Sequence, residues 1–207
     1  MIDNFWVFAF TALMLNLTPG NDMLYVMARS SGQGVKAGVV SSLGIMAGCT
    51  VHMLAAVAGI SALITQSALA FNVIKYIGAA YLVYLGMKAI TNKKTALILH
   101  QNITPLSYKK IFWQGVITNV LNPKVALFFL AFLPQFINDS ENAALQILLL
   151  GSWFNFSGTV INVAVAFLFG KIGSFFLRWP NFVLWQQRIT GSLLVVLGIK
   201  VALSSKK

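Results

Sequence analysis

Two long apolar segments of this chain are each interrupted once by a proline with polar neighbours. The interruptions are centred on Pro19, within residues 16–22, and on Pro123, within residues 118–124. Proline removes a backbone donor and pushes the preceding residue out of the helical region, so each segment is predicted to break there. Backbone groups freed inside a membrane are tolerated only where protein or a wet cavity satisfies them. The two breaks are therefore predicted to line an internal site.

The composition places the chain in a membrane. It is 58% hydrophobic and 9% charged, whereas a soluble domain carries roughly 25% charged residues. Apolar stretches long enough to span a bilayer are predicted at 5–27, 38–64, 68–90, 111–137, 143–169 and 185–203. Six such helices with short loops make one all-α integral membrane domain over residues 1–207.

The net charge of +11 sits in the loops, so the sequence indicates membrane topology and no nucleic-acid partner. The first, third and fifth connections carry Lys and Arg, whereas the fourth carries only Asp139 and Glu141. Basic loops stay in the cytoplasm. This pattern predicts a multi-pass protein with a periplasmic N-terminus and cytoplasmic odd-numbered loops.

The two halves of the chain resemble each other. Aligning Pro19 with Pro123 places Phe8 on Phe112, and residues 75–88 and 188–200 share a basic residue, a glycine three positions later, an apolar run and Gly-x-Lys. Because each half has three spans, the second enters the membrane from the opposite side, as an inverted repeat. We predict repeat one at 1–90, a cytoplasmic linker at 91–110 and repeat two at 111–207, with spans 1 and 4 broken by proline.

One acid and one base lie deep in the predicted spans, each within three residues of a break: Asp22 and Lys124. A charge at the bilayer centre costs at least about 2.5–3.5 kcal/mol and usually faces a cavity or a partner. Two readings of Asp22 stay open, a cap of the half-helix that restarts after Pro19 and a carboxylate that binds a proton or substrate. Lys124 could snorkel, but we expect it to face inward. The hypothesis is that Asp22 and Lys124 bracket a zwitterion.

Amide side chains flank both breaks, with Asn16 and Asn21 at the first and Asn119 and Asn122 at the second. Amides can bond freed backbone groups or bind the amino and carboxyl groups of a substrate. The backbone role is favoured for Asn16, and both roles stay open for Asn119 and Asn122.

Two further polar residues lie in the predicted spans. His52 in the second span is either a packing residue or a proton relay. Asn155 in the fifth span is a candidate substrate contact, with hydrogen bonding between helices as its default reading. Two histidines and one cysteine give no recognisable metal site, and no phosphate-binding glycine loop appears. No cofactor and no enzyme activity are expected.

Several ordered motifs extend over nearly the whole chain: Leu17-Thr18-Pro19-Gly20-x-Asp22, Arg29-x-x-x-x-Gly34-x-x-x-Gly38, Gly44-x-x-x-Gly48-x-x-x-His52, the run 77–86, Phe112-x-x-Gly115, Asn122-Pro123-Lys124 and the run 128–136. Together they resemble one family, the lysine exporter and homoserine/threonine resistance (LysE/RhtB) family of amino-acid exporters. The resemblance implies a six-helix bacterial inner-membrane protein that exports amino acids by proton antiport, with Asp22, Asn122 and Lys124 at its centre. Asn21 departs from the family pattern, which has a second proline there, and adds an amide.

The sequence therefore predicts a secondary exporter of small amino acids or close derivatives, such as homoserine, threonine and other neutral or basic amino acids, in exchange for protons. Two rival readings are a cation exporter and a non-transporting membrane module on a related six-helix scaffold. The expected partners are the amino acid, protons and the lipid bilayer. Monomer and homodimer both stay open.

Overall fold

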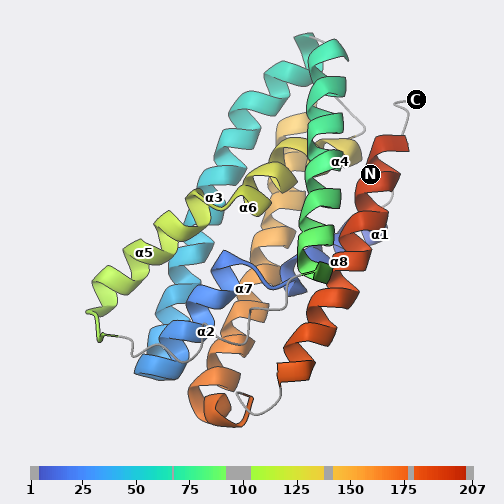
Figure 1. The fold of residues 1–207 in the computed structure, drawn as a ribbon. Coiled ribbons are helices and arrows are strands. Elements are labelled where there is room, and N and C mark those ends of the chain that lie inside the picture. The colour runs from blue at the N-terminus through green and yellow to red at the C-terminus, as the bar shows by residue number, and fades with distance from the viewer. Residues whose placement is uncertain (1–4, 67, 92–103, 138–141, 177–179, 204–207) are drawn as a thin grey trace.

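The computed structural model describes residues 5–66, 68–91, 104–137, 142–176 and 180–203. Most of the predicted linker, at 92–103, and the acidic residues Asp139 and Glu141 lie outside the described residues. The described residues form long helices that run side by side, crossed by shorter broken ones (Figure 1).

Helices cover all six segments that the sequence predicts to be apolar spans. In chain order they are α1 Phe5–Leu17, α2 Asn21–Gln33, α3 Val35–Gln66, α4 Ala68–Thr91, α5 Tyr108–Val120, α6 Pro123–Leu127, a π-helical turn Phe128–Phe132, a 3-10 turn Leu133–Phe136, α7 Ala143–Phe176 and α8 Pro180–Leu203. Within the described residues, Val35–Gly59 and Ala143–Lys171 are long and apolar enough to cross a membrane, and the bent segment from Tyr108 to Phe136 makes a third. The all-helical membrane class is thus confirmed.

Both predicted breaks are present. Helix α1 ends at Leu17 and α2 begins at Asn21. Helix α5 ends at Val120 and α6 begins at Pro123, with a bend of 46° between them. Proline suits the first turn of a helix because its missing N–H would have no intrahelical partner there.

Glycines let α3 and α5 approach each other closely. A Cβ atom added at Gly48 would lie 2.7 Å from the Val116 carbonyl oxygen and 2.8 Å from Asn119 Cβ, and one added at Gly115 would lie 2.8 Å from the Ser41 oxygen. Small residues of this kind permit tight helix packing in membranes. The contact holds the end of α5, and with it the second break, against α3.

Aromatic side chains pack the other face of the second break against α1 and α7. The rings of Phe128 and Phe154 stack with centroids 3.9 Å apart, and Phe8 of α1 contacts Phe128 at 5.8 Å. All three side chains are buried. This cluster positions the two broken segments relative to α7 and encloses the polar groups between them.

Candidate functional site

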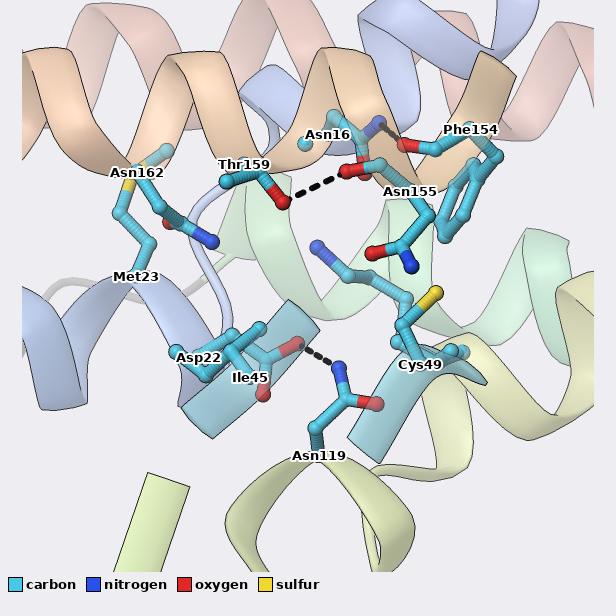
Figure 2. A pocket seen from close by; sticks show the side chains of 13 residues that line it. Asn16, Asp22, Met23, Ile45, Cys49, Asn119, Phe154, Asn155, Thr159 and Asn162 are labelled. Atoms are coloured by element: carbon cyan, nitrogen blue, oxygen red, sulfur yellow. Dashed lines mark hydrogen bonds between the residues drawn. The ribbon is translucent and has the colours of Figure 1, made fainter. Parts of the chain in front are cut away.

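A small polar pocket of about 30 Å³ lies where the two breaks meet α3 and α7 (Figure 2). Five of the predicted site residues line it together: Asn16, Asp22, Asn119, Lys124 and Asn155. The side chains come from both halves of the chain, so the structure brings the polar groups of the two breaks to one place. The side chains of Asp22 and Lys124 do not lie on opposite sides of the bundle, which is the arrangement that would have contradicted the zwitterion hypothesis.

Lys124 satisfies the backbone that Pro19 frees. Its Nζ donates to the carbonyl oxygens of Leu15 at 3.2 Å and Thr18 at 3.0 Å. In an unbroken helix the Leu15 oxygen would accept from the N–H at position 19, which proline lacks. The carbonyl end of α1 also carries the negative end of the helix dipole, which favours a cation. A lysine beside the second break therefore donates hydrogen bonds to the carbonyl oxygens freed at the first break.

His52 has the corresponding role at the second break. Its Nε2 lies 3.0 Å from the carbonyl oxygen of Asn119, the group left without an N–H at position 123 by Pro123. A carbonyl only accepts, so Nε2 carries the hydrogen in this bond. The ring also stacks on Phe129, with centroids 6.2 Å apart. His52 contacts the break and not the Asp22 carboxylate.

Asp22 is 8% exposed and faces Asn119. Its Oδ2 accepts from Asn119 Nδ2 at 2.9 Å, and the carboxyl group also interacts with the Asn122 side chain. The N-cap of α2 is Gly20, with no side-chain capping bond. Asp22 therefore does not cap α2. Its carboxylate lies in the first turn of α2, near the positive end of that helix dipole.

Asn122 divides its amide between two situations. Its Oδ1 accepts from the backbone N–H of Lys124 at 3.0 Å and so caps α6, which is the backbone role foreseen from the sequence. The same side chain also interacts with the Asp22 carboxyl group, whereas the Oδ1 of Asn119 is buried without a hydrogen-bond partner. Buried polar groups without partners are costly and rare. The second break therefore retains hydrogen-bonding capacity that a bound group can use.

Asn16 and Asn155 connect helices across the pocket wall. Asn16 Nδ2 donates to the Phe154 carbonyl oxygen at 3.0 Å and to Ser157 Oγ at 3.1 Å on α7. Asn155 Nδ2 donates at 3.2 Å to the Met46 carbonyl oxygen of α3. Asn155 thus makes the bond between helices that the sequence indicated, whereas Asn16 bonds α7 and leaves the freed carbonyls of its own break to Lys124.

A second, larger cavity also has Lys124 in its lining. It is lined by two more of the predicted residues, Asn21 and Asn122, and by the breaks themselves, Pro19, Gly20 and Pro123. Its wall also includes Tyr81, Tyr84 and Lys88 of α4, which sequence reasoning did not assign to the site. The signal was present in the Tyr-x-x-Tyr spacing and in the Gly-x-Lys repeat. The predicted site residues are thus divided between two cavities that share Lys124, except for His52, which lines neither.

The pocket walls contain no assembled metal centre. Among the residues that the structure describes, no group of three or more His, Cys, Asp or Glu side chains lies close enough together to hold a metal ion. The pocket near Asp22 also includes Thr159 and Asn162 of α7. Its chemistry is therefore one carboxylate, one ammonium group and several amides, an arrangement suited to protons and small polar ligands.

The chain matches the family described as LysE type translocator over residues 13–205. It is 34% identical over 209 residues to the uncharacterized membrane protein YrhP of Bacillus subtilis (93% of this chain, 95% of the relative). It is 35% identical over 135 residues to a leucine efflux protein of Salmonella choleraesuis (65% and 64%). A homoserine/homoserine lactone efflux protein of Salmonella typhimurium is 30% identical over 199 residues (95% and 96%). No solved structure matches the chain.

Proposed function

This chain belongs to the LysE type translocator family of amino-acid efflux proteins, which are not enzymes, and we propose that it exports small neutral or basic amino acids in exchange for protons. The observation that carries the proposal is the convergence of both proline breaks on one buried acid and one lysine. The similar proteins are named for leucine and for homoserine and its lactone, which makes these compounds the first candidates to test.

The proposal includes two inverted repeats of three spans. Equivalent contacts recur in the two halves, which supports it. The oxygens of Leu15 and Asn119, both four residues before a break proline, each accept an N–H from three residues later, at 3.2 and 2.9 Å. A Cβ added at Gly86 would lie 2.5 Å from the Gly191 oxygen, and one added at Gly198 would lie 2.8 Å from the Ala79 oxygen. The two contacts join nearly equivalent repeat positions, because Gly198 is the counterpart of Gly86 and Ala79 adjoins Gly78, the counterpart of Gly191.

The proposed orientation puts the N-terminus in the periplasm of a bacterial inner membrane. Contacts between basic segments support placing them on one side of the membrane. Arg29 donates to the Thr104 oxygen at 3.3 Å and to Gln114 Oε1 at 3.0 Å, and Lys36 lies 4.9 Å from the Tyr108 ring centre. The first connection and the end of the third, both predicted to be cytoplasmic, therefore lie together.

In the proposed mechanism Asp22 carries the proton. A volume of about 30 Å³ exceeds the roughly 10–15 Å³ that one water requires, so water can reach the carboxylate. Such a pocket is too small for an amino acid. Lys124 has three N–H donors, and the Leu15 and Thr18 carbonyls take two. We assign the third to the substrate carboxylate, which is bound as the two halves rock to expose either side.

Counterflow of labelled amino acids in proteoliposomes, with a panel of neutral and basic amino acids, tests the export proposal. Wild-type protein is expected to exchange at least one of them. Asp22→Asn retains the shape of the side chain and an oxygen that can accept from Asn119. It is therefore expected to fold and to exchange substrate while losing uphill export driven by a proton gradient. Gradient-driven export at the normal rate in this variant would refute the coupling role of Asp22.

A further inference from the structure

The second cavity has a size suited to an amino acid. Its volume is about 450 Å³, within the roughly 300–1,000 Å³ of small-molecule sites. The pocket around Asp22, at about 30 Å³, has room for water only. Lys124 lines both, so its ammonium group stands between a space for a proton or water and a space for a solute.

The charge of the second cavity is one-sided. Lys88 and Lys124 line it, and none of the described residues that line it is acidic. Asn122, which is 2% exposed, also lines it. Two ammonium groups in a cavity whose described lining contains no carboxylate favour an anionic group and disfavour a cationic side chain.

The rest of the wall is apolar or aromatic. Tyr81 and Tyr84 lie with ring centroids 5.9 Å apart, beside Leu24, Leu85 and Leu194. Aromatic faces and leucine side chains provide contact area for an uncharged side chain of moderate size. The cavity therefore has a cationic part and an apolar part, which matches an amino acid whose side chain is neutral.

We propose that this cavity is the substrate chamber: Lys88 and Lys124 hold the carboxylate of the amino acid, and Tyr81 and Tyr84 contact its apolar side chain. The inference rests on the proposed export function and narrows it from neutral or basic amino acids to neutral ones. Lysine and arginine are excluded because their side chains would place a second positive charge beside two ammonium groups.

The chain offers closely matched control variants. Tyr84 and Tyr76 lie on the same helix and are both 56% exposed, but only Tyr84 lines the cavity. Lys88 and Lys171 each lie over an aromatic ring, at 5.8 Å from the centre of Tyr84 and 5.9 Å from that of Phe167, but only Lys88 lines the cavity. Tyr84→Ala is therefore compared with Tyr76→Ala, and Lys88→Gln with Lys171→Gln.

The experiment measures counterflow of labelled leucine in proteoliposomes, with unlabelled leucine, alanine or lysine as competitor. Wild-type protein is expected to prefer leucine and to ignore lysine. Tyr84→Ala is expected to reduce the preference for leucine over alanine about tenfold, the effect of about one methylene contact in an apolar pocket. Lys88→Gln is expected to raise the KM for leucine and the KM for alanine about threefold, and to make both KM values less dependent on salt concentration. The control variants Tyr76→Ala and Lys171→Gln should change neither the preference for leucine over alanine nor the KM.

The outcomes separate this inference from the export function. Competition by lysine as strong as that by leucine would overturn it, as would an unchanged leucine-to-alanine preference in Tyr84→Ala with normal leucine exchange. Either result would leave amino-acid export standing. Absence of exchange for every amino acid in the wild-type protein would instead overturn the proposed function. Thermal unfolding of each variant in detergent distinguishes a folding defect from loss of binding.

Discussion

Replacing Lys124 by methionine tests whether the two breaks support each other. Methionine keeps a similar length but cannot donate to the carbonyl oxygens of Leu15 and Thr18, which accept from Nζ at 3.2 and 3.0 Å. It also leaves the buried Asp22 carboxylate without the positive charge that lines the same pocket. We therefore expect Lys124→Met to destabilise the fold at the first break.

The size of the effect follows from these two losses. Bonds between membrane helices average about 0.6 kcal/mol with a maximum near 1.7, and bonds from charged donors in soluble proteins reach about 1.5–3. At about 1 kcal/mol for each bond and a similar amount for the lost counter-charge, we expect about 2–3 kcal/mol. Burying methionine removes the cost of desolvating an ammonium group, but removing one member of a buried charged set is usually destabilising overall.

Thermal unfolding in detergent, followed by tryptophan fluorescence, measures the change. For a chain of this size about 1 kcal/mol lowers the Tm by roughly 2–4 °C, so a decrease of about 4–12 °C is expected. Asp22→Asn provides the other side of a double-mutant cycle, because it removes the charge and keeps the shape. Asp22→Asn should lower the free energy of unfolding less in the Lys124→Met background than in the wild-type protein. The difference between the two losses, the coupling energy, should be at least about 0.5 kcal/mol.

Two results would contradict this reasoning. A Tm for Lys124→Met equal to that of the wild-type protein would show that the freed carbonyls do not depend on the lysine. Strict additivity with Asp22→Asn would show that the two side chains do not interact across the pocket.

Three further predictions test the packing and the contact between the ends of α2 and α5. Gly48→Ala should lower the free energy of unfolding by about 1–3 kcal/mol, because its Cβ would lie 2.7 Å from a carbonyl oxygen and overpack α3 against α5. Gly59→Ala in the same helix is the control, since its Cβ would have nothing within 4 Å. In thermal unfolding this control should be neutral or stabilising. Asn16→Ala removes two bonds to α7 and should cost about 1–2 kcal/mol in the same assay; an unchanged Tm would exclude a structural role. Arg29→Gln removes the exposed bonds to the Thr104 oxygen and to Gln114 of α5 and should cost at most about 1 kcal/mol in the same assay; a loss of about 2 kcal/mol or more would show that this contact contributes more than exposed charged bonds usually do.

The sequence predicts the breaks well because the effect of proline is local. Pro19 and Pro123 remove their own N–H groups wherever they lie in the fold, so the helix ends at Leu17 and Val120 follow from residue type. Predicting which side chains meet at the site requires a further comparison between the two breaks. Matching polar residues beside the breaks suggests the hypothesis that Asp22 and Lys124 lie close together, and both line the polar pocket.

The identity of each hydrogen-bond partner lies beyond such local reasoning. Lys124 bonds carbonyls 109 and 106 residues earlier, and His52 bonds one 67 residues later. The His52 contact depends on how close α3 and α5 come together, which glycines decide, and the Lys124 contacts depend on how the two breaks lie against each other, which aromatic packing decides. For the same reason the two-cavity arrangement, and the place of Tyr81 and Tyr84 in it, emerges only once α4 is positioned against both breaks.

The contact between Gly20 and Lys124 explains why the two halves differ at their centre. Each residue directly follows a break proline, so the two occupy equivalent positions in the proposed repeat. A Cβ at Gly20 would lie 3.2 Å from Lys124 Nζ and 3.4 Å from Cε, closer than most side-chain contacts. Two long side chains therefore cannot occupy both positions. The half with glycine leaves space, and the half with lysine uses that space to reach the carbonyls of the other break. The proposed two-fold symmetry is thus broken where a single cation is needed, and Lys124 serves both cavities.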